Sequence, residues 1–279
     1  MKQILAILLA LILCVSAAGT AVTEETEEMT LLAINVRKAD ALLLRSGSSV
    51  YLIDTGTKKS FDALYAVLRE EGITRLTGVV ITHTDMDHAG GLAQLVDSGI
   101  EIENVYASAY YNKKNETKHP AVKALKGTGM EVVFLSSGDS LPLDGGRLSV
   151  LGPLEKDDEK ENNNSLVLLA EGGGGSILLA GDMEFPEESD LLSAGVIPQA
   201  DVLKIGNHGD NDATSEALLN AVQPKVAVIS TSTEEKSSTP SSRVLRLLSK
   251  WNVEVFQTQE AKTGILVTIR DGNIDVEIK

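Results

Sequence analysis

Short apolar segments separated by polar turns predict a strand-rich first half of the chain. Strands are expected over 31–36, 41–45 and 50–53, where apolar residues alternate or run together. A helix is expected over 60–71, because its apolar residues recur three or four positions apart and Gly72 follows it. The remaining expected elements are strands over 76–82, 102–107 and 131–135, a helix-like segment over 92–96, and a polar, lysine-rich helix or loop between the last two strands.

The second half repeats this order of strands and helices. Its expected elements are strands over 148–151, 166–169, 177–180, 201–205 and 226–229, an amphipathic helix over 241–250, and a closing hairpin of 264–270 and 274–278. The glycine run 172–175 is interpreted as a hairpin tip, because no helix follows it as in a phosphate-binding loop. Two such halves without a linker predict one α/β (α+β) domain, with two sheets packed face to face and helices outside.

The first residues have the pattern of a secretory signal peptide. Lys2 precedes an apolar run over 4–15 that is too short to span a bilayer comfortably, and small residues follow it. A retained N-terminal anchor is one alternative. Cys14, the single cysteine, raises lipid attachment as another, although the bulky Leu13 before it counts against this.

Cleavage is expected after Ala18 or Ala21, which leaves a mature chain without cysteine and therefore without disulfides. We expect a signal peptide over 1–21, an acidic linker over 22–29 and a folded domain over 30–279. The protein is then exported, either to the medium or to the cell envelope, with no transmembrane span in the mature chain.

Composition narrows the expected partners. The net charge is −15 and aromatic residues make up 4% of the chain. Tight, nonspecific binding to nucleic acid relies on lysine and arginine, and single strands are usually held by stacking on aromatic rings. We therefore expect no stable nucleic-acid complex, while a phosphodiester held through metal ions stays compatible with this charge.

The segment from His83 to His88 concentrates side chains that bind metals. Its H-x-D-x-D-H spacing places two histidines and two acids within six residues, between an expected strand and an expected helix. Imidazole and carboxylate together suit Zn²⁺ or a similar first-row metal. Acids and histidines this dense repel one another unless a cation compensates them. The segment therefore indicates a metal site; a helix-capping loop that uses Asp85 or Asp87 is the alternative.

Other potential ligands stand at the ends of expected strands. Asp54 follows the strand over 50–53, Asp182 follows 177–180, and His208 follows 201–205. Any one of these residues could simply cap a turn, but their recurrence favours a site shared with the His83–His88 segment. His119 lies in a polar stretch and is expected at the surface rather than on a metal.

These motifs resemble the metallo-β-lactamase superfamily over nearly the whole chain from Leu31 onward. The matching segments are Ile53-Asp54-Thr55-Gly56, the H-x-D-x-D-H loop with Gly90-Gly91, Ala180-Gly181-Asp182 and Gly206-Asn207-His208-Gly209. Within the superfamily, Asp85 in place of a second histidine is most similar to the ComEC-type branch, as are the segments 162–167 and 203–209. That branch includes the soluble domain of the DNA-uptake protein ComEC and secreted phosphodiesterases related to phosphorylcholine esterase. The resemblance implies an αββα sandwich of two mixed sheets with a metal pair at one edge.

The resemblance also implies a set of six metal ligands. His83 and Asp85 would hold one metal, Asp87 and His88 would hold the other with His208, and Asp182 would bridge the two. Asp54 would orient the loop or its histidines from behind. Two divalent ions, Zn²⁺ with Mn²⁺ as the alternative, would polarise a phosphoryl or carbonyl oxygen and supply a hydroxide near neutral pH. Asp87 and Asp182 are then the expected catalytic carboxylates.

Three departures from the branch bear on the chemistry. Only Asn162, Asn163 and Asn164 stand where the superfamily usually has a further histidine, so the first metal would be weakly held, or completed by Asn and water. Asn207 replaces a histidine that would face the scissile phosphate, and it takes that catalytic position without an imidazole. The segments 37–40 and 238–240 differ from the branch's Gly-Gln-Gly-Asp and Gly-His-Pro.

The leading hypothesis is an exported metal-dependent hydrolase, with phosphodiesterase as the favoured activity and a small molecule or phosphodiester as its substrate. A lactone or ester hydrolase is the alternative within the same chemistry. The altered positions also leave open a different class, a cell-envelope binding module that keeps the fold and has lost catalysis. The sequence does not determine the oligomeric state.

Overall fold

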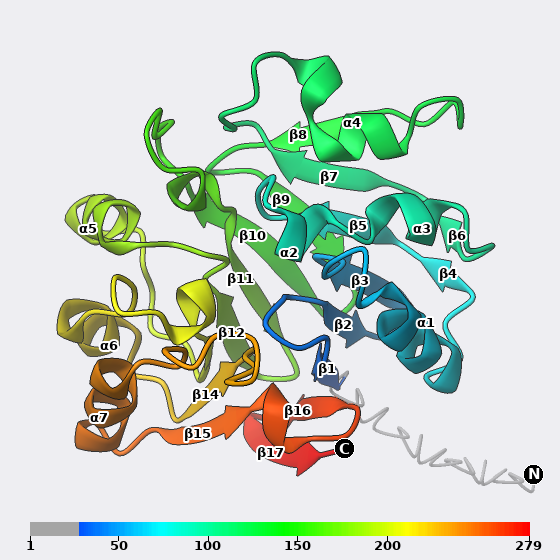
Figure 1. Ribbon diagram of the computed structural model, residues 1–279. Coiled ribbons are helices and arrows are strands. Elements are labelled where there is room, and N and C mark those ends of the chain that lie inside the picture. Colours follow the sequence, from blue (N-terminus) through cyan, green and yellow to red (C-terminus); the bar gives the residue numbers. More distant parts are fainter. Residues whose placement is uncertain (1–27) are drawn as a thin grey trace, which may run out of the picture.

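The structure, a computed structural model, describes residues 28–279 (Figure 1). The expected signal peptide over 1–21 and nearly all of the expected linker lie outside these residues. The first strand begins at Met29, one residue before the expected start of the domain. Across residues 28–279, no helix combines the length and apolar character needed to cross a membrane.

One sheet contains the first half of the chain and the C-terminal hairpin. Its eight described strands, in spatial order, are β17 (Asn273–Ile278), β16 (Gly264–Arg270), β1 (Met29–Ile34), β2 (Leu42–Ser46), β3 (Ser49–Ile53), β5 (Gly78–Ile81), β7 (Val105–Ser108) and β8 (Val132–Leu135). The pairs from β17 to β3 are antiparallel, and those from β3 to β8 are parallel. The expected closing hairpin is confirmed, and it pairs with β1.

The second sheet has the same division into antiparallel and parallel parts. Its seven described strands, in spatial order, are β15 (Glu254–Gln257), β14 (Val226–Ile229), β13 (Val202–Lys204), β12 (Gly175–Leu179), β11 (Val167–Gly172), β10 (Gly146–Gly152) and β9 (Ser140–Leu143). The pairs from β15 to β12 are parallel, and those from β12 to β9 are antiparallel. The glycine run forms the tip of the β11–β12 hairpin as predicted, with Gly173 and Gly174 in the left-handed region at φ 60° and 79°.

Two strand predictions need correction. The single strands expected over 76–82 and 102–107 are each two elements: β4 (Arg75–Leu76) pairs with β6 (Glu101–Ile102) in a small separate sheet, whereas β5 and β7 enter the main sheet. The chain bends between β4 and β5 at Thr77, whose amide bonds to the carbonyl oxygen of Val50 at 2.8 Å. The edge strands β9 and β15 were not expected, because β9 contains Pro142 and both are short and only partly buried.

Helices cover the outer face of each sheet (Figure 1). The helices are α1 (Phe61–Glu70), α2 (Met86–Ala89), α3 (Leu92–Val96), α4 (Pro120–Ala124), α5 (Phe185–Ser193), α6 (Glu216–Val222) and α7 (Ser242–Lys250), with short 3₁₀ turns η1 (Glu116–Lys118), η2 (Asn162–Asn164), η3 (Gly206–Gly209) and η4 (Thr258–Glu260). α1, α3 and α4 pack on the first sheet and α5, α6 and α7 on the second.

Three apolar layers hold these parts together. The middle layer lies between the sheets and includes Leu31, Leu168 and Val267, each fully buried. The outer layers lie between each sheet and its helices, around Leu64 in one and Leu203 in the other. Removing these side chains from water is the main stabilising contribution to a fold of this kind. The predicted αββα sandwich is confirmed.

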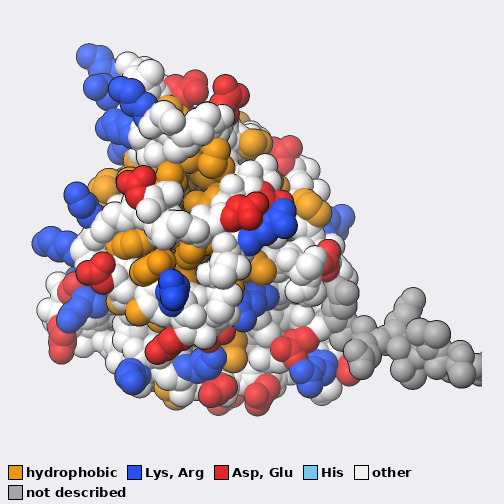
Figure 2. Space-filling view, turned by 90° about the vertical axis from the view of Figure 1, so that its right-hand side faces the viewer, with side chains coloured by type: hydrophobic (Ala, Val, Ile, Leu, Met, Phe, Trp, Pro, Cys, Tyr) orange, Lys and Arg blue, Asp and Glu red, His pale blue; other side chains and the backbone are white. Residues whose placement is uncertain are grey.

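The described part of the face that carries α1 and α3 has no continuous basic surface (Figure 2). Acidic and basic side chains are interspersed over most of it, and positive side chains gather only at one upper corner. Proteins that bind duplex nucleic acid without sequence preference usually present a basic stripe along the backbone. This face therefore gives no support to nonspecific binding of a long polyanion.

Candidate metal centre

The candidate centre lies where parallel strands of both sheets end. Asp54 follows β3 and His83 follows β5 in the first sheet, while Asp182 and His208 come after β12 and β13 in the second. β3 and β5 are parallel neighbours, and so are β12 and β13, so the carboxyl ends of each pair meet at one edge. Side chains far apart in the sequence thereby come together, as ligands commonly do at this edge of parallel sheets.

The loop between β5 and α2 is held tightly against the turn after β3. The Thr55 amide bonds to the His88 carbonyl oxygen at 2.7 Å. A Cβ added at Gly91 would lie 2.3 Å from the carbonyl oxygen of Thr55, so only glycine allows this approach. Asp85 stands at the N-cap position of α2 without a side-chain capping bond. The loop's acids are therefore not used as helix caps, which removes the support for the capping alternative.

Three buried histidines each have one ring nitrogen engaged and the other free. The Nδ1 atoms lie 2.7 Å from Asp54 Oδ2 for His88, 3.0 Å from the Ser230 carbonyl oxygen for His208, and 3.1 Å from Thr82 Oγ1 for His83. The Nε2 atom of each ring is buried and has no hydrogen-bond partner. Buried nitrogens without partners are costly, and a ring held at Nδ1 with Nε2 free is typical of a metal ligand. The three rings therefore fit a metal.

Asp182 lies at the centre of these rings. Its Oδ2 atom is 3.3 Å from the Nε2 of His88, 3.6 Å from that of His208 and 4.0 Å from that of His83. Its Oδ1 atom is buried and has no hydrogen-bond partner. Asp87 approaches from the open side, with Oδ2 3.5 Å from His208 Nε2. A carboxylate between three imidazoles is placed to bind the same metal as these rings.

The candidate ligand atoms form four overlapping groups, and within each group they lie within 4.8 Å of one another. Two groups consist of predicted ligands alone: His83, His88 and Asp182 in one, and Asp87, His88 and His208 in the other. The other two include Asp40, with Asp54 and His88 or with Asp182 and His208. Asp54 stands behind His88 and accepts two further bonds, from the Thr82 amide and hydroxyl, each at 2.8 Å. The structure thus brings together the side chains that the sequence pattern selected.

The electrostatics of the group depend on a compensating positive charge. Burial raises the pKa of Asp182, but the charges of His88 and His208 outweigh it and hold this pKa well below the usual range. Burial lowers the pKa of His88, but Asp182 and Asp54 raise it well above that of a free histidine. For His83, burial and the charge of His88 both act to lower the pKa. A divalent cation bound here would compete with protons for these side chains, because metal binding releases protons from its ligands.

The half of the centre around His83 is less complete. Asp85 lies further out, with a side chain 44% exposed and Oδ2 3.9 Å from His83 Nε2. Asn163 and Asn164 use their amides within the loop that precedes β11, where both bond to Asp157. The expectation that an asparagine completes the first metal is therefore not supported at these two positions, because their amide groups are already engaged.

The side-chain amide of Asn207 is hydrogen-bonded to two acids. Its amide donates to Glu184 Oε1 at 3.4 Å and to Asp212 Oδ1 at 3.2 Å. Asn207 and His208 both have left-handed backbones, with φ 44° and 53°, a conformation that is costly for residues other than glycine and often occurs at functional sites. This turn directs His208 into the centre, while the Asn207 side chain is engaged with two acids.

Two buried charges beside the centre were not selected from the sequence. Lys204 and Asp40 are 0% and 1% exposed and form an ion pair of 3.0 Å. Burial raises the pKa of Asp40, but Lys204, His208 and His88 lower it below the usual value overall. The sequence did contain one indication of this pair: a lysine within the apolar strand over 201–205, where the alternation of side chains along a strand places it on a buried face.

The surface position expected for His119 is wrong. His119 is 1% exposed, and its ring contacts those of Tyr111 and Phe134, with centroids 4.9 and 5.5 Å apart. Its Nδ1 accepts the Ala121 amide at 3.2 Å and caps α4. A polar neighbourhood in the sequence concealed this role, because capping depends on one residue and not on its neighbours.

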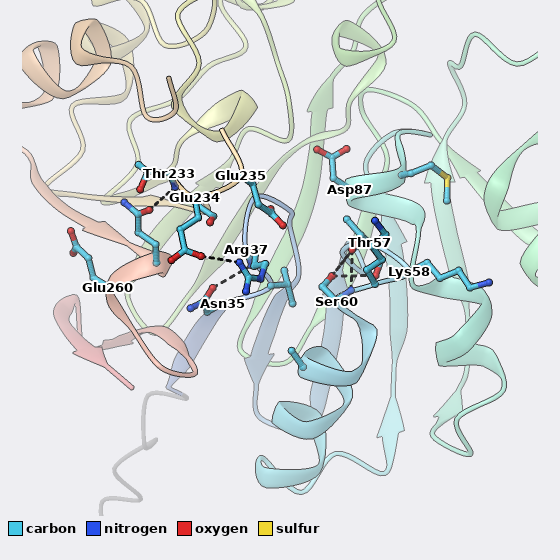
Figure 3. Close-up of a pocket in the computed structure, with 16 residues that line it drawn as sticks. Asn35, Arg37, Thr57, Lys58, Ser60, Asp87, Thr233, Glu234, Glu235 and Glu260 are labelled. Atoms are coloured by element: carbon cyan, nitrogen blue, oxygen red, sulfur yellow. Dashed lines mark hydrogen bonds and ion pairs between the residues drawn. The ribbon is translucent and has the colours of Figure 1, made fainter. Parts of the chain in front are cut away.

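A groove of about 1230 Å³ opens beside Asp87 (Figure 3). One wall is the turn after β3 with the start of α1, including Thr57, Lys58 and Ser60; the facing wall is the loop of Glu234 and Glu235. Arg37 reaches Glu234 across its floor at 3.1 Å. The walls carry charges of opposite sign, and none of the residues that line the groove is aromatic. The groove can therefore receive a polar small molecule next to the candidate metal-binding side chains.

Comparison with known sequences agrees with this geometry. A family model described as the metallo-beta-lactamase superfamily matches residues 34–233. ComE operon protein 3 of Bacillus subtilis (strain 168) is 30% identical over 228 residues, which are 76% of this chain and 29% of that protein. Recombination protein 2 of Haemophilus influenzae is 28% identical over 222 residues, 78% of this chain and 26% of that protein. The chain thus spans less than a third of the length of these relatives.

Solved structures show the same fold at low sequence identity. YhfI from Bacillus subtilis, a metallo-beta-lactamase fold protein, superposes with a TM-score of 0.59 at 14% identity and covers 87% of this chain and 99% of its own. A diphosphatase from the PhnP family superposes with a TM-score of 0.52 at 13% identity, covering 87% and 97%. From the family model, the competence-protein relatives and the shared fold together, this chain belongs to the metallo-β-lactamase superfamily and is a distant homologue of ComEC-like competence proteins.

Proposed function

We propose that the protein is an exported metal-dependent hydrolase that cleaves phosphodiesters with two divalent ions, Zn²⁺ or alternatively Mn²⁺. The observation that carries the proposal is the set of three buried Nε2 atoms without partners around Asp182. A protein with only a structural use for these residues would leave three donors or acceptors unpaired at a cost. A metal pair would give all three nitrogens a partner.

The proposed ligands divide between two metal sites of unequal affinity. Asp87, His88 and His208 would form the stronger site, since all three are already close together. His83 and Asp85 would form the weaker site, because the Asp85 side chain is 44% exposed and its Oδ2 atom lies 3.9 Å from His83 Nε2. Asp182 would bridge. Zinc sites that catalyse hydrolysis usually keep an open position for water or substrate, which the weaker site would supply.

The chain's own residues position the reaction. When bound, a metal pair polarises the phosphoryl oxygen and lowers the pKa of water. Asp54 fixes the ring of His88, and the Ser230 carbonyl fixes that of His208. Lys38, whose Nζ is 3.1 Å from Asp87 Oδ2, places a positive charge at the groove side of the centre, where it would attract an anionic substrate.

The phosphodiester substrate is supported by the relatives and by the charge of the site. A recombination protein and a competence protein are homologous, and a diphosphatase from the PhnP family shares the fold. However, the same fold also occurs in CmlA of Streptomyces venezuelae, a diiron β-hydroxylase with a TM-score of 0.56. The fold alone therefore does not select the substrate, and a lactone or ester is the alternative to test alongside.

The test compares substrate classes on one preparation. The purified protein is assayed with bis(p-nitrophenyl) phosphate, an aryl ester and a lactone, each with added Zn²⁺, with Mn²⁺ and after chelation. We expect chelator-sensitive cleavage of the phosphodiester. If metal-loaded protein cleaves only the ester or the lactone, the substrate is an ester or lactone and not a phosphodiester. If folded protein binds metal but cleaves none of the three, the binding module without catalysis is favoured.

Export is proposed from the pattern of residues 1–21. Expression in a secreting host should release a protein whose N-terminus, read by mass spectrometry, follows Ala18 or Ala21. A mature protein that begins at Cys14 and carries lipid would show envelope anchoring instead. An uncleaved chain recovered with membranes would show a retained anchor.

A further inference from the structure

We propose that Asp40 and Lys204 form a buried charge pair that sets how tightly the centre binds its metals. The inference rests on the proposed function but concerns two residues outside the proposed ligand set. Each comes from a different half of the chain: Asp40 lies between β1 and β2, and Lys204 ends β13. The pair therefore joins the two sheets directly beneath the candidate ligands.

The position of Lys204 follows from the alternation of side chains along β13. Val202 packs in the layer between the sheets and Leu203 packs in the layer beneath the outer helices, so Lys204 points inward like Val202. Its Nζ atom lies 3.0 Å from Asp40 Oδ2 and 3.1 Å from the Ile205 carbonyl oxygen. A charge this deeply buried needs a fixed counter-ion, which Asp40 provides.

Asp40 connects this lysine to the loops that carry the ligands. Its amide donates to the Asp87 carbonyl oxygen at 3.1 Å, and its own carbonyl accepts the Gly56 amide at 2.7 Å. Lys204 holds its Oδ2 atom, whereas Oδ1 is buried and has no partner. The carboxylate is thus fixed in position and retains an unused acceptor.

That carboxylate lies among ligands from both sheets. An oxygen of Asp40 is within 4.8 Å of ligand atoms of Asp182 and His208, and an oxygen of Asp40 is equally close to Asp54 and His88. A unit charge at such a distance inside a protein changes the affinity for a divalent ion by about tenfold or more. Asp40 alone would strengthen metal binding, and Lys204 alone would weaken it. Together, Asp40 and Lys204 hold the ligand loops and add little net charge to the centre.

This arrangement predicts opposite effects of removing the two partners. Asp40→Asn leaves the lysine charge uncompensated and should weaken zinc binding by about 10–100-fold, as changes behind metal ligands commonly do. Lys204→Met leaves the carboxylate uncompensated and should tighten zinc binding by about tenfold. The double variant Asp40→Asn/Lys204→Met should bind zinc more nearly as the wild-type chain does.

The experiment measures the zinc affinity of the full chain and these variants by competition with a chromogenic chelator, with circular dichroism to confirm folding. Lys225→Met is the matched control, because Lys225 forms a 2.8 Å ion pair with Asp201 at the surface of the same sheet. The control should bind zinc as the wild-type chain does. Opposite shifts in the two single variants support the inference that these two buried charges set the zinc affinity.

The inference is overturned if the zinc affinities of both single variants shift in the same direction, or if folded variants bind zinc as tightly as the wild-type chain does. The pair would then be a structural ion bridge. If Lys204→Met does not fold, Asp40→Asn and the double variant decide: recovery of affinity in the double variant supports the inference, and no recovery overturns it. A wild-type chain that binds no zinc would overturn the proposed function as well. The wild-type measurement therefore distinguishes failure of the proposed function from failure of the inference about the pair.

Discussion

The three imidazole rings of the centre are held by three different kinds of partner. A carboxylate holds His88, a backbone carbonyl holds His208 and a hydroxyl holds His83. A carboxylate raises the basicity of the ring it holds more than a neutral acceptor does. We therefore expect His88, which belongs to three of the four candidate ligand groups, to bind metal most strongly.

The expected strength of metal binding by His88 depends on Asp54. Asp54→Asn keeps the shape of the side chain but removes the charge that orients His88, so zinc affinity should fall by about 10–100-fold. Chelator competition measures the effect. Asp62→Asn, on the exposed side of α1, is the matched control and should leave affinity unchanged. Unchanged zinc affinity in folded Asp54→Asn would show that this carboxylate does not orient a ligand.

Sequence reasoning at the residue scale found the candidate ligands because they form a dense motif and recur at strand ends. It did not find Asp40 and Lys204, because their significance depends on how the two sheets face each other. It placed His119 at the surface because the neighbouring residues are polar, whereas the ring packs against Tyr111 and Phe134. Pairing across distant segments leaves little signal in a single sequence.

At the scale of elements, the close approach of two loops shapes the centre. Gly91→Ala would place a methyl group against the Thr55 carbonyl, one residue from Asp54. We expect a loss of about 2–3 kcal/mol in the free energy of unfolding, together with weaker zinc binding. Denaturant unfolding and chelator competition measure the two effects.

Gly72→Ala is the comparison for that variant, because Gly72 has open space around it and a left-handed backbone at φ 70°. It should cost about 1 kcal/mol through backbone strain alone and leave zinc binding unchanged. Equal effects of the two substitutions on zinc binding would contradict the role given to the loop contact.

Helix α4 carries a pH-dependent cap. Burial and the charge of Lys113 lower the pKa of His119 to about 4, against the opposing effect of Glu161. The unfolded chain then binds the proton more readily, so the contribution of His119 is complete above pH 6.5 and is lost as pH falls towards 4. The loss amounts to at most about 3 kcal/mol.

His119→Asn keeps a capping acceptor without a titrating ring. Between pH 7.5 and 4.5, the free energy of unfolding of the wild-type chain should fall further than that of the variant, as measured by denaturant unfolding. Parallel losses in both proteins would show that His119 does not titrate in this range.

Most elements followed from the apolar pattern, since the central strands and α1 and α7 lie close to their expected bounds. The elements that were missed have weak patterns. β9 contains proline, β15 is only partly buried, and β4 has two residues. Their pairing is decided by neighbouring strands rather than by their own composition.

At the scale of the whole molecule, the proposed metals would join the two halves of the sandwich. His83 and His88 follow strands of the first sheet, whereas Asp182 and His208 follow strands of the second. A ligand that binds only the folded state stabilises it in proportion to its affinity and concentration. Metal binding should therefore stabilise the sandwich as a unit.

Chelation should lower the unfolding temperature of the wild-type chain. Zinc at 100 times its dissociation constant contributes about 2.7 kcal/mol, which corresponds to roughly 5–10 °C for a domain of this size. Thermal unfolding with and without chelator measures the shift, and His208→Ala should show little of it. An unfolding temperature that does not respond to metal would contradict a centre that links the sheets.

The zinc content of the purified wild-type chain, measured by elemental analysis beside Asp87→Ala and His208→Ala, tests whether the centre holds two metals. We expect about two zinc ions per wild-type chain and less than one in each folded variant. A folded wild-type chain that holds no metal at micromolar zinc, or variants that retain both ions, would contradict this expectation.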